Sequence, residues 1–209
     1  MQGHRLTTLR GHGSDVSCCA LSADGALIVS GSADTRLKVW HAASGAQLRT
    51  LRGHGHEVAC CALSADGLVA SGAGRLVKVH EAATGSLLRT LRGHREAVTA
   101  VAFRPRAAAG GRDRDGQLLS AGCDMTLRLW GARNGLLLRT VDGQGGVLTC
   151  ALFAPGGEWM LTGGYDATLR IWCADSGAPR RRTRPQHGRR GPQAPPGGLG
   201  AKRERGVSG

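Results

Sequence analysis

The run TLRGH decides the fold of this chain. It occurs at residues 8–12, 50–54 and 90–94, and a degenerate copy, TVDGQ, stands at residues 140–144. Counted from the His or Gln that ends each copy, the spacings are 42, 40 and 50 residues. Self-similarity at a nearly constant period of about 40 residues is typical of repeat proteins, in which each repeat is one small structural unit.

The residues that follow each copy predict four short strands per repeat. An apolar residue comes four positions after each His or Gln and opens a strand-like run: VSCCAL, VACCAL, VTAVAF and LTCALF. A turn, a second apolar run, a third run such as RLKVW or TLRLW, and a fourth such as QLRTL complete the unit. The turns between the runs are rich in Gly, Asp and Ser, and no helical period competes with this pattern.

These residues resemble the WD40 family, whose repeats run from a Gly-His pair to a Trp-Asp pair in four-stranded blades. The resemblance implies an all-β propeller or an open partial propeller of four blades, and a role in protein interaction. The Asp that usually follows the Trp is missing, because His41, Glu81, Gly131 and Cys173 stand in its place. We place the repeats at about residues 5–45, 46–85, 86–135 and 136–177.

In the family, four polar residues tie each blade together: the His of Gly-His, a Ser or Thr, an Asp in the next turn, and the Trp. Repeats one and three have all four, repeat four has Gln144 in place of the His, and repeat two lacks the Asp and has His80 in place of the Trp. We therefore expect repeat two to be the weakest blade. The predicted tetrad residues are His12, Ser30, Asp34, Trp40, His54, Ser71, His94, Ser120, Asp124, Trp130, Thr162, Asp166 and Trp172.

The Ser, His and Asp of a tetrad are also the residues of a hydrolase triad, with Ser30 or Ser120 as the nucleophile. A catalytic site does not usually recur once per structural unit, and the chain has no G-x-S-x-G elbow, so we expect no enzymatic activity. We also expect no cofactor and no metal ion. The adjacent cysteines Cys18–Cys19 and Cys60–Cys61 point to opposite faces of a strand and act as buried filler.

Residues 178–209 differ from the body in composition. They hold nine Lys or Arg residues, one acidic residue and five of the seven prolines, in a chain of net charge +13. Such a segment cannot bury enough apolar surface to offset its ordering entropy, so we expect disorder. Its basic clusters are typical of nucleic acid binding or nuclear import, and a tail without function is the alternative.

Residues 104–116 form an insertion in repeat three that predicts an exposed loop.

The chain has no apolar run long enough for a membrane span and no signal peptide at its start, and its seven cysteines are an odd number. These features predict an intracellular protein, in the cytoplasm or the nucleus.

The predicted function is a scaffold for other proteins. The alternatives are a substrate receptor of a ubiquitin ligase, whose usual motifs are absent, and RNA binding through the tail. The candidate contact residues lie in the Gly-His and Asp loops: Ser14, Asp15, His56, Glu57, Arg95, Glu96, Met125 and Tyr165.

Ring closure is the remaining question. Residues 5–10, RLTTLR, match the fourth strand of a blade, while repeat four supplies only three strands before residue 177. The first segment can therefore complete the last blade in a ring of four. We favour an open arc, since blades of this family are shaped for larger rings. An open arc leaves faces and edges of strands unpaired, which favours self-association.

Overall fold

The computed structural model describes residues 7–105, 116–142 and 145–179. Within these ranges the chain contains strands and turns and no helix. The described part therefore holds no helix that is long and apolar enough to cross a membrane. Most of the insertion at 104–116, the Gln144 position, and the tail beyond residue 179 lie outside the described residues.

The strands form four antiparallel sheets, each made of strands consecutive in the chain. Blade one contains β1 (Val16–Leu21), β2 (Leu27–Ser32), β3 (Leu37–His41) and β4 (Gln47–Leu51). Blade two contains β5 (Val58–Leu63), β6 (Leu68–Ala73), β7 (Leu76–Glu81) and β8 (Leu87–Leu91). Blade three contains β9 (Val98–Phe103), β10 (Gln117–Gly122), β11 (Leu127–Gly131) and β12 (Leu137–Val141). Blade four contains β13 (Leu148–Phe153), β14 (Trp159–Gly164) and β15 (Leu169–Cys173).

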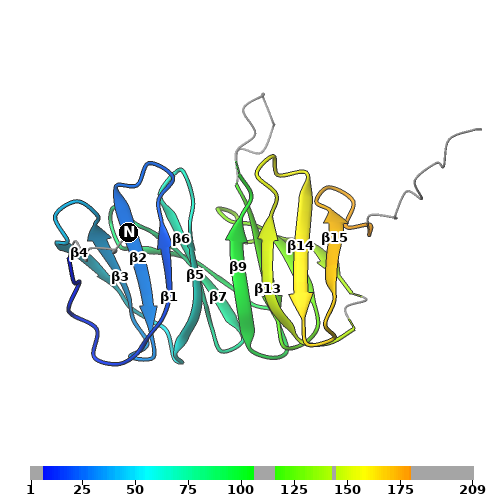
Figure 1. Ribbon diagram of the computed structural model, residues 1–209, viewed down its shortest axis with the longest axis horizontal. Coiled ribbons are helices and arrows are strands. Elements are labelled where there is room, and N and C mark those ends of the chain that lie inside the picture. Colours follow the sequence, from blue (N-terminus) through cyan, green and yellow to red (C-terminus); the bar gives the residue numbers. More distant parts are fainter. Residues whose placement is uncertain (1–6, 106–115, 143–144, 180–209) are drawn as a thin grey trace, which may run out of the picture.

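The four blades stand in an open row, with blade one at one end and blade four at the other (Figure 1). The first strands of the blades pack in sequence, β1 on β5, β5 on β9 and β9 on β13. The hydrophobic core is correspondingly divided into three clusters, one between each pair of neighbouring blades. Each sheet is too thin to hold a core of its own, so its apolar side chains are buried only by the next blade.

The all-β, WD40-like fold expected from the repeats is confirmed, in the form of an open partial propeller. One detail differs from the expectation of four four-stranded blades, because blade four has three described strands. In the other repeats, the turn after the third strand leads into a leucine-rich run such as LLRTL. After Gly177 the sequence is APRRRTRP instead, and the described part of it makes one isolated bridge, between Pro179 and Trp172.

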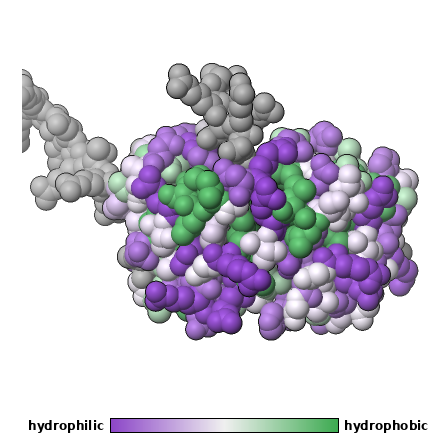
Figure 2. All heavy atoms as spheres, turned by 180° about the vertical axis from the view of Figure 1, so that it is seen from behind, coloured by the Kyte–Doolittle hydropathy of each residue, from purple (hydrophilic) through white to green (hydrophobic). Residues whose placement is uncertain are grey.

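Most of the visible surface is hydrophilic, with separate hydrophobic patches on the face opposite that of Figure 1 (Figure 2). The outer strands contribute several exposed leucines, at Leu48 in β4, Leu87 in β8, and Leu137 and Leu138 in β12.

The blade-to-blade packing predicts a large stability difference between two glycines of blade two. A Cβ atom at Gly72 would lie 2.6 Å from Cys60 Sγ and 2.8 Å from Val98 Cγ1, whereas one at Gly55 would meet no atom within 4 Å. We expect Gly72→Ala to lower the free energy of unfolding by about 1–3 kcal/mol, because it overpacks the contact between blades two and three. Gly55→Ala is the control and should change it by less than about 0.5 kcal/mol. Urea unfolding of both variants checks this, and equal stabilities would contradict the packing argument.

Candidate functional site

The predicted tetrads of blades one and three have the same geometry. In blade one, His12 Nδ1 donates to Asp34 Oδ2 at 2.9 Å, Ser30 Oγ lies 2.7 Å from His12 Nε2, and Trp40 Nε1 donates to Ser30 Oγ at 2.8 Å. In blade three, His94 Nδ1 lies 3.0 Å from both Asp124 oxygens. Its Nε2 lies 2.8 Å from Ser120 Oγ, which accepts from Trp130 Nε1 at 2.8 Å. A continuous chain of hydrogen bonds thus links the loop before each blade to its second and third strands.

The aspartate of each tetrad also fixes the turn between the second and third strands. Asp34 accepts from the Gly13 and Arg36 backbone N–H groups at 2.8 and 2.9 Å. Asp124 accepts from Arg95 N at 2.9 Å and from Thr126 N at 3.1 Å. The residue after the aspartate adopts a left-handed conformation, with φ of 66° at Thr35, 60° at Met125 and 57° at Ala167. This conformation is unfavourable for residues other than glycine, so the carboxylate supports a strained turn.

Blade two is built differently, because its turn is one residue shorter and contains Gly74, with φ of 53°, at the left-handed position. His54 Nε2 lies 2.8 Å from Ser71 Oγ, but the fourth member is His80, whose ring centre is 5.6 Å from that of His54. Neither Nδ1 atom has a partner with good hydrogen-bond geometry among the described residues. Burial, together with the nearby His80 and Lys78, lowers the pKa of His54 to about 4.

In blade four, Trp172 Nε1 donates to Thr162 Oγ1 at 3.0 Å, as in the complete tetrads. Asp166 is held instead by its own turn: it accepts from Thr168 Oγ1 at 2.7 Å and from Arg170 Nη1 at 2.5 Å. Hydrogen bonds from Thr168 and then from Arg170 lower the pKa of Asp166 to about 2. Arg170 thus satisfies the carboxylate that a histidine satisfies in blades one and three.

The Ser–His–Asp distances are those of a hydrolase triad, but the serines are in the wrong place for catalysis. Ser120 is 0% exposed and Ser30 is 7% exposed, and each hydroxyl oxygen already accepts a hydrogen bond from a tryptophan. A nucleophile must reach a substrate carbonyl and pass its proton to the histidine, and the burial of both hydroxyls leaves no room for that approach. The arrangement therefore suits a structural role.

The electrostatics of the tetrads keep the carboxylates ionised. Burial alone would raise the pKa of Asp34, but hydrogen bonds from Gly13 N–H, the His12 ring and Arg36 N–H together lower it to about 2. For His94, burial disfavours the charged ring and lowers its pKa, while the hydrogen bond to Asp124 opposes that shift. Each tetrad is therefore a charged acceptor surrounded by donors.

Three of the cysteines, Cys18, Cys60 and Cys61, pack at the contacts between blades. Cys19 is exposed, so the expectation that both adjacent pairs act as buried filler is wrong for that residue. Cys60 is buried, and its burial raises the pKa of its thiol to about 12, so it stays protonated. Cys18 and Cys61 interact across blades one and two, and the hydrogen bond from Cys61 lowers the pKa of Cys18. The described residues include no group of three or more His, Cys, Asp or Glu side chains arranged to hold a metal ion.

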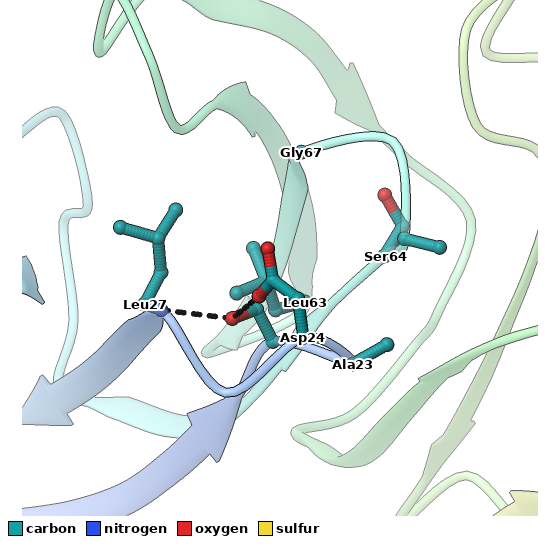
Figure 3. Close-up of a pocket in the computed structure, with 8 residues that line it drawn as sticks. Ala23, Asp24, Leu27, Leu63, Ser64 and Gly67 are labelled. Carbon is teal, nitrogen blue, oxygen red and sulfur yellow. Dashed lines mark hydrogen bonds between the residues drawn. The ribbon is translucent and has the colours of Figure 1, made fainter. Parts of the chain in front are cut away.

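A shallow pocket of about 240 Å³ lies between the β1–β2 and β5–β6 turns of blades one and two (Figure 3). Its polar atoms are already used within the turns. Ser22 Oγ donates to Asp24 Oδ1 at 2.5 Å and accepts from Leu27 N at 2.8 Å, while Ala26 N donates to Asp24 Oδ1 at 3.0 Å. The pocket therefore lies between two neighbouring turns, and the side-chain hydrogen bonds of Ser22, Asp24 and Ser64 stay within each turn.

The predicted contact residues all lie at one end of the blades, which we call the Gly-His rim. This rim consists of the loops before β1, β5, β9 and β13 and of the turns between the second and third strands. Backbone hydrogen bonds join these loops and turns, from Ala33 N to Asp15 O, Cys123 N to Ala97 O and Tyr165 N to Val147 O, at 2.8–3.0 Å. All of the contact candidates are exposed, namely Ser14, Asp15, His56, Glu57, Arg95, Glu96, Met125 and Tyr165.

The sequence analysis missed two groups of residues at this rim. Thr126 and Thr168 each donate to the aspartate two residues earlier, at 2.8 and 2.7 Å. Arg170 takes over the role of the histidine in blade four. The Asp-x-Thr spacing shared by repeats three and four was a usable signal for the threonines, because Asp and Thr side chains commonly cap turns at this separation. The role of Arg170 depends on the conformation of one side chain, and no local pattern indicates it.

We expect Asp124→Ala to lower the free energy of unfolding by about 3 kcal/mol, because it leaves the buried His94 ring and two backbone N–H groups without their acceptor. The control is Asp175→Ala, which removes a carboxylate whose side chain is 74% exposed and pairs with Arg104 at the surface. That change should cost less than about 1 kcal/mol. Thermal and urea unfolding compare the two variants, and a small effect of Asp124→Ala would show that the tetrad contributes little to stability.

The histidines of blade two predict acid sensitivity above the range in which the aspartates titrate. The pKa of His54 is about 4 in the folded chain and 6.5 for the ordinary side chain, so the unfolded chain binds more protons between these values. Stability should therefore fall as the pH decreases from about 6.5 towards 4. His54→Gln introduces the residue type found at position 144 and should flatten this decrease in unfolding measurements across the same pH range. An unchanged slope would contradict the assignment.

Comparison with known proteins identifies the family of the repeats. The family model described as "WD domain, G-beta repeat" (WD40) matches residues 3–41, 45–81, 85–131 and 135–173. The solved structure titled "Crystal structure of RRP9 WD40 repeats" aligns with a TM-score of 0.73 and 29% identity, over 82% of this chain and 52% of that one. "Structure of U3-55K" aligns with a TM-score of 0.73 and 28% identity, over 82% of this chain and 53% of that one.

No curated protein sequence matches the chain. The chain spans about half the length of the solved structures it resembles. The four family matches coincide with the four blades and together cover most of the sequence. The chain therefore belongs to the WD40 family of WD domain, G-beta repeat proteins.

Proposed function

We propose that this chain is a non-catalytic scaffold that binds other proteins through the Gly-His rim. The observation that carries the proposal is the contrast between the rim side chains and the backbone beneath them. The side chains are exposed, while their loops and turns are fixed by backbone hydrogen bonds and by the aspartates of the tetrads. A rigid frame lowers the entropy lost when exposed side chains are immobilised by a partner.

The residue types at the rim also support protein binding. Tyr165 is 81% exposed and Met125 is 48% exposed, and both stand on turns that follow a second strand. Arg95 is exposed nearby, in the loop before β9. Tyr and Arg are enriched among the residues that dominate binding energy, and Met and Arg are enriched in interfaces generally. WD40 domains generally mediate protein–protein interaction, which agrees with this use of the rim.

A capture experiment with matched variants tests the proposal. The full chain, the double variant Arg95→Ala/Tyr165→Ala and the control Leu136→Ala are used as baits in cell extract, and bound proteins are quantified by mass spectrometry. Leu136 is 61% exposed but lies in the loop between β11 and β12, at the opposite end of the blades. We expect a set of proteins that the control retains and the rim variant loses by roughly tenfold or more.

The composition of that set separates the remaining alternatives. Ubiquitin ligase adaptors among the rim-dependent proteins would specify a substrate receptor. Capture that depends on salt and RNA, and that disappears when residues 178–209 are removed, would favour the tail instead. Identical sets for the rim variant and the control would overturn the proposed role of the rim.

A further inference from the structure

The chain contains the same blade-to-blade contact three times, so both sides of that contact can be defined. The first strand of each following blade inserts an apolar residue against the blade before it, and these residues, Val58, Val98 and Leu148, are at most 1% exposed. The receiving side contains a small residue of the second strand and a large one of the third. A Cβ atom added at Gly31 would lie 2.6 Å from Val58 Cγ1, and one at Gly72 would lie 2.8 Å from Val98 Cγ1.

Blade four presents the receiving side of this contact, and no other described blade packs on it. Leu169 of β15 is 67% exposed, whereas its counterparts Leu37, Val77 and Leu127 in the third strands of the other blades are 0–1% exposed. Among the described residues, a Cβ atom at Gly163, the counterpart of Gly31 and Gly72, would meet Cys150 of its own blade and no residue of another blade. Thr149 donates to Gly163 O of its own blade and to no other blade in the described part of the chain, whereas its counterpart Thr99 also donates to Leu148 O of the next blade, at 2.7 Å.

Blade one presents the inserting side, also uncovered. Val16 is 57% exposed, although Val58, Val98 and Leu148 at the same place in the repeat are buried. Leu21 at the end of the same strand is 60% exposed, whereas its counterpart Phe153 in blade four is 7% exposed. The two ends of the row in Figure 1 therefore expose the two sides of the contact that joins neighbouring blades.

The segment before blade one adds a third complementary feature. Gly45 lies against Leu9, whose Cδ2 would be 3.0 Å from an added Cβ atom. The same relation joins Gly85 to Leu51 of β4 and Gly135 to Leu91 of β8, at 3.4 and 3.6 Å. Leu9 thus lies where the outer strand of a preceding blade would lie, and blade four is the blade whose described strands lack an outer strand.

We propose that two copies of this chain associate head to tail, with blade one of each copy packed on blade four of the other. Val16 then lies over Gly163 of the second copy, and the segment around Thr7–Leu9 forms the outer strand beside β15. The pairing of β3 with β4 sets the expected register, because Leu37 pairs with Leu51 and Lys38 with Thr50. Across the copies, the corresponding pairs are Leu169 with Leu9 and Arg170 with Thr8.

A second copy is the occupant that satisfies both ends of the row at once. Head-to-tail contacts generate a closed ring when the rotation between copies closes, and two copies of four blades make eight, which is within the range of propellers. One chain spans 52% of the RRP9 WD40 structure, so two copies correspond to about the length of one such domain. Terminal repeats with uncovered apolar faces are unfavourable in water, which supplies the driving force.

The mass of the full chain in solution tests the proposal directly. Light scattering after size-exclusion chromatography should give about twice the 21.7 kDa of one chain. Val16→Glu and Leu169→Glu should each give a monomer, because each places a charge in both of the equivalent contacts. Leu136→Glu is the control, since Leu136 is 61% exposed and lies on neither end of the row, and it should remain a dimer. Circular dichroism reports whether each variant keeps its sheet content.

Mixing the two monomeric variants tests the head-to-tail direction. The Val16→Glu chain has an intact blade four and the Leu169→Glu chain has an intact blade one, so together they can form one normal contact. We expect the mixture to form a dimer that is weaker than the wild-type dimer, since only one of its two contacts is intact. A mixture that stays monomeric would overturn the head-to-tail arrangement, as would a wild-type chain that is monomeric or larger than a dimer.

A crosslink tests the position of the N-terminal segment. Leu9→Cys in one chain and Leu169→Cys in another should give a disulfide-linked dimer after mild oxidation, at a yield well above that of either variant alone. The single variants and the wild-type chain control for the native cysteines. A yield no higher than these controls would show that the segment does not pair with β15 of a second copy.

Discussion

The requirement that every sheet be covered by its neighbour controls this structure. A blade of three or four short strands has two faces and little interior, so its apolar side chains are buried only where another blade packs against them. In this chain the contact is specific: a Val or Leu at the start of one blade fits over a small residue of the blade before it, as Val58 does over Gly31. The three core clusters, the course of the row and the exposed residues at its ends all follow from this contact.

The tetrads have a different task, which is to hold together parts of a blade that packing alone does not join. In blades one and three, one aspartate accepts from a histidine ring, from the loop before the blade and from a strained turn. The same hydrogen bonds that make the serine–histidine–aspartate set look like a triad bury the serine beneath a tryptophan. Blades two and four show that this support is replaceable, by a glycine turn in one and by Arg170 in the other.

The two proposals concern different surfaces of the molecule. The Gly-His rim consists of loop tips at one end of all four blades, whereas the head-to-tail contact uses the flat faces of the first and last blades. A partner bound at the rim and a second copy at the ends would not compete for the same side chains. If the ring closes, the loops of both copies form one continuous rim, which would give a scaffold two equivalent sets of contact sites.

The sequence by itself determined the repeat and the strand order within each blade, while the tetrad positions came from the resemblance to the WD40 family. The repeat and the strand order depend on local spacing: TLRGH at a nearly constant period, apolar runs of strand length, and Gly or Asp at the turns. The tertiary structure alone decided which strand-like segments pair and which apolar residues are exposed. RLTTLR at residues 5–10 and QLRTL in β4 read alike, yet residues 7–10 form no strand whereas β4 pairs with β3. Val16 and Val58 hold the same position in the repeat, and one is exposed while the other is buried, because burial depends on a neighbouring blade that no local pattern specifies.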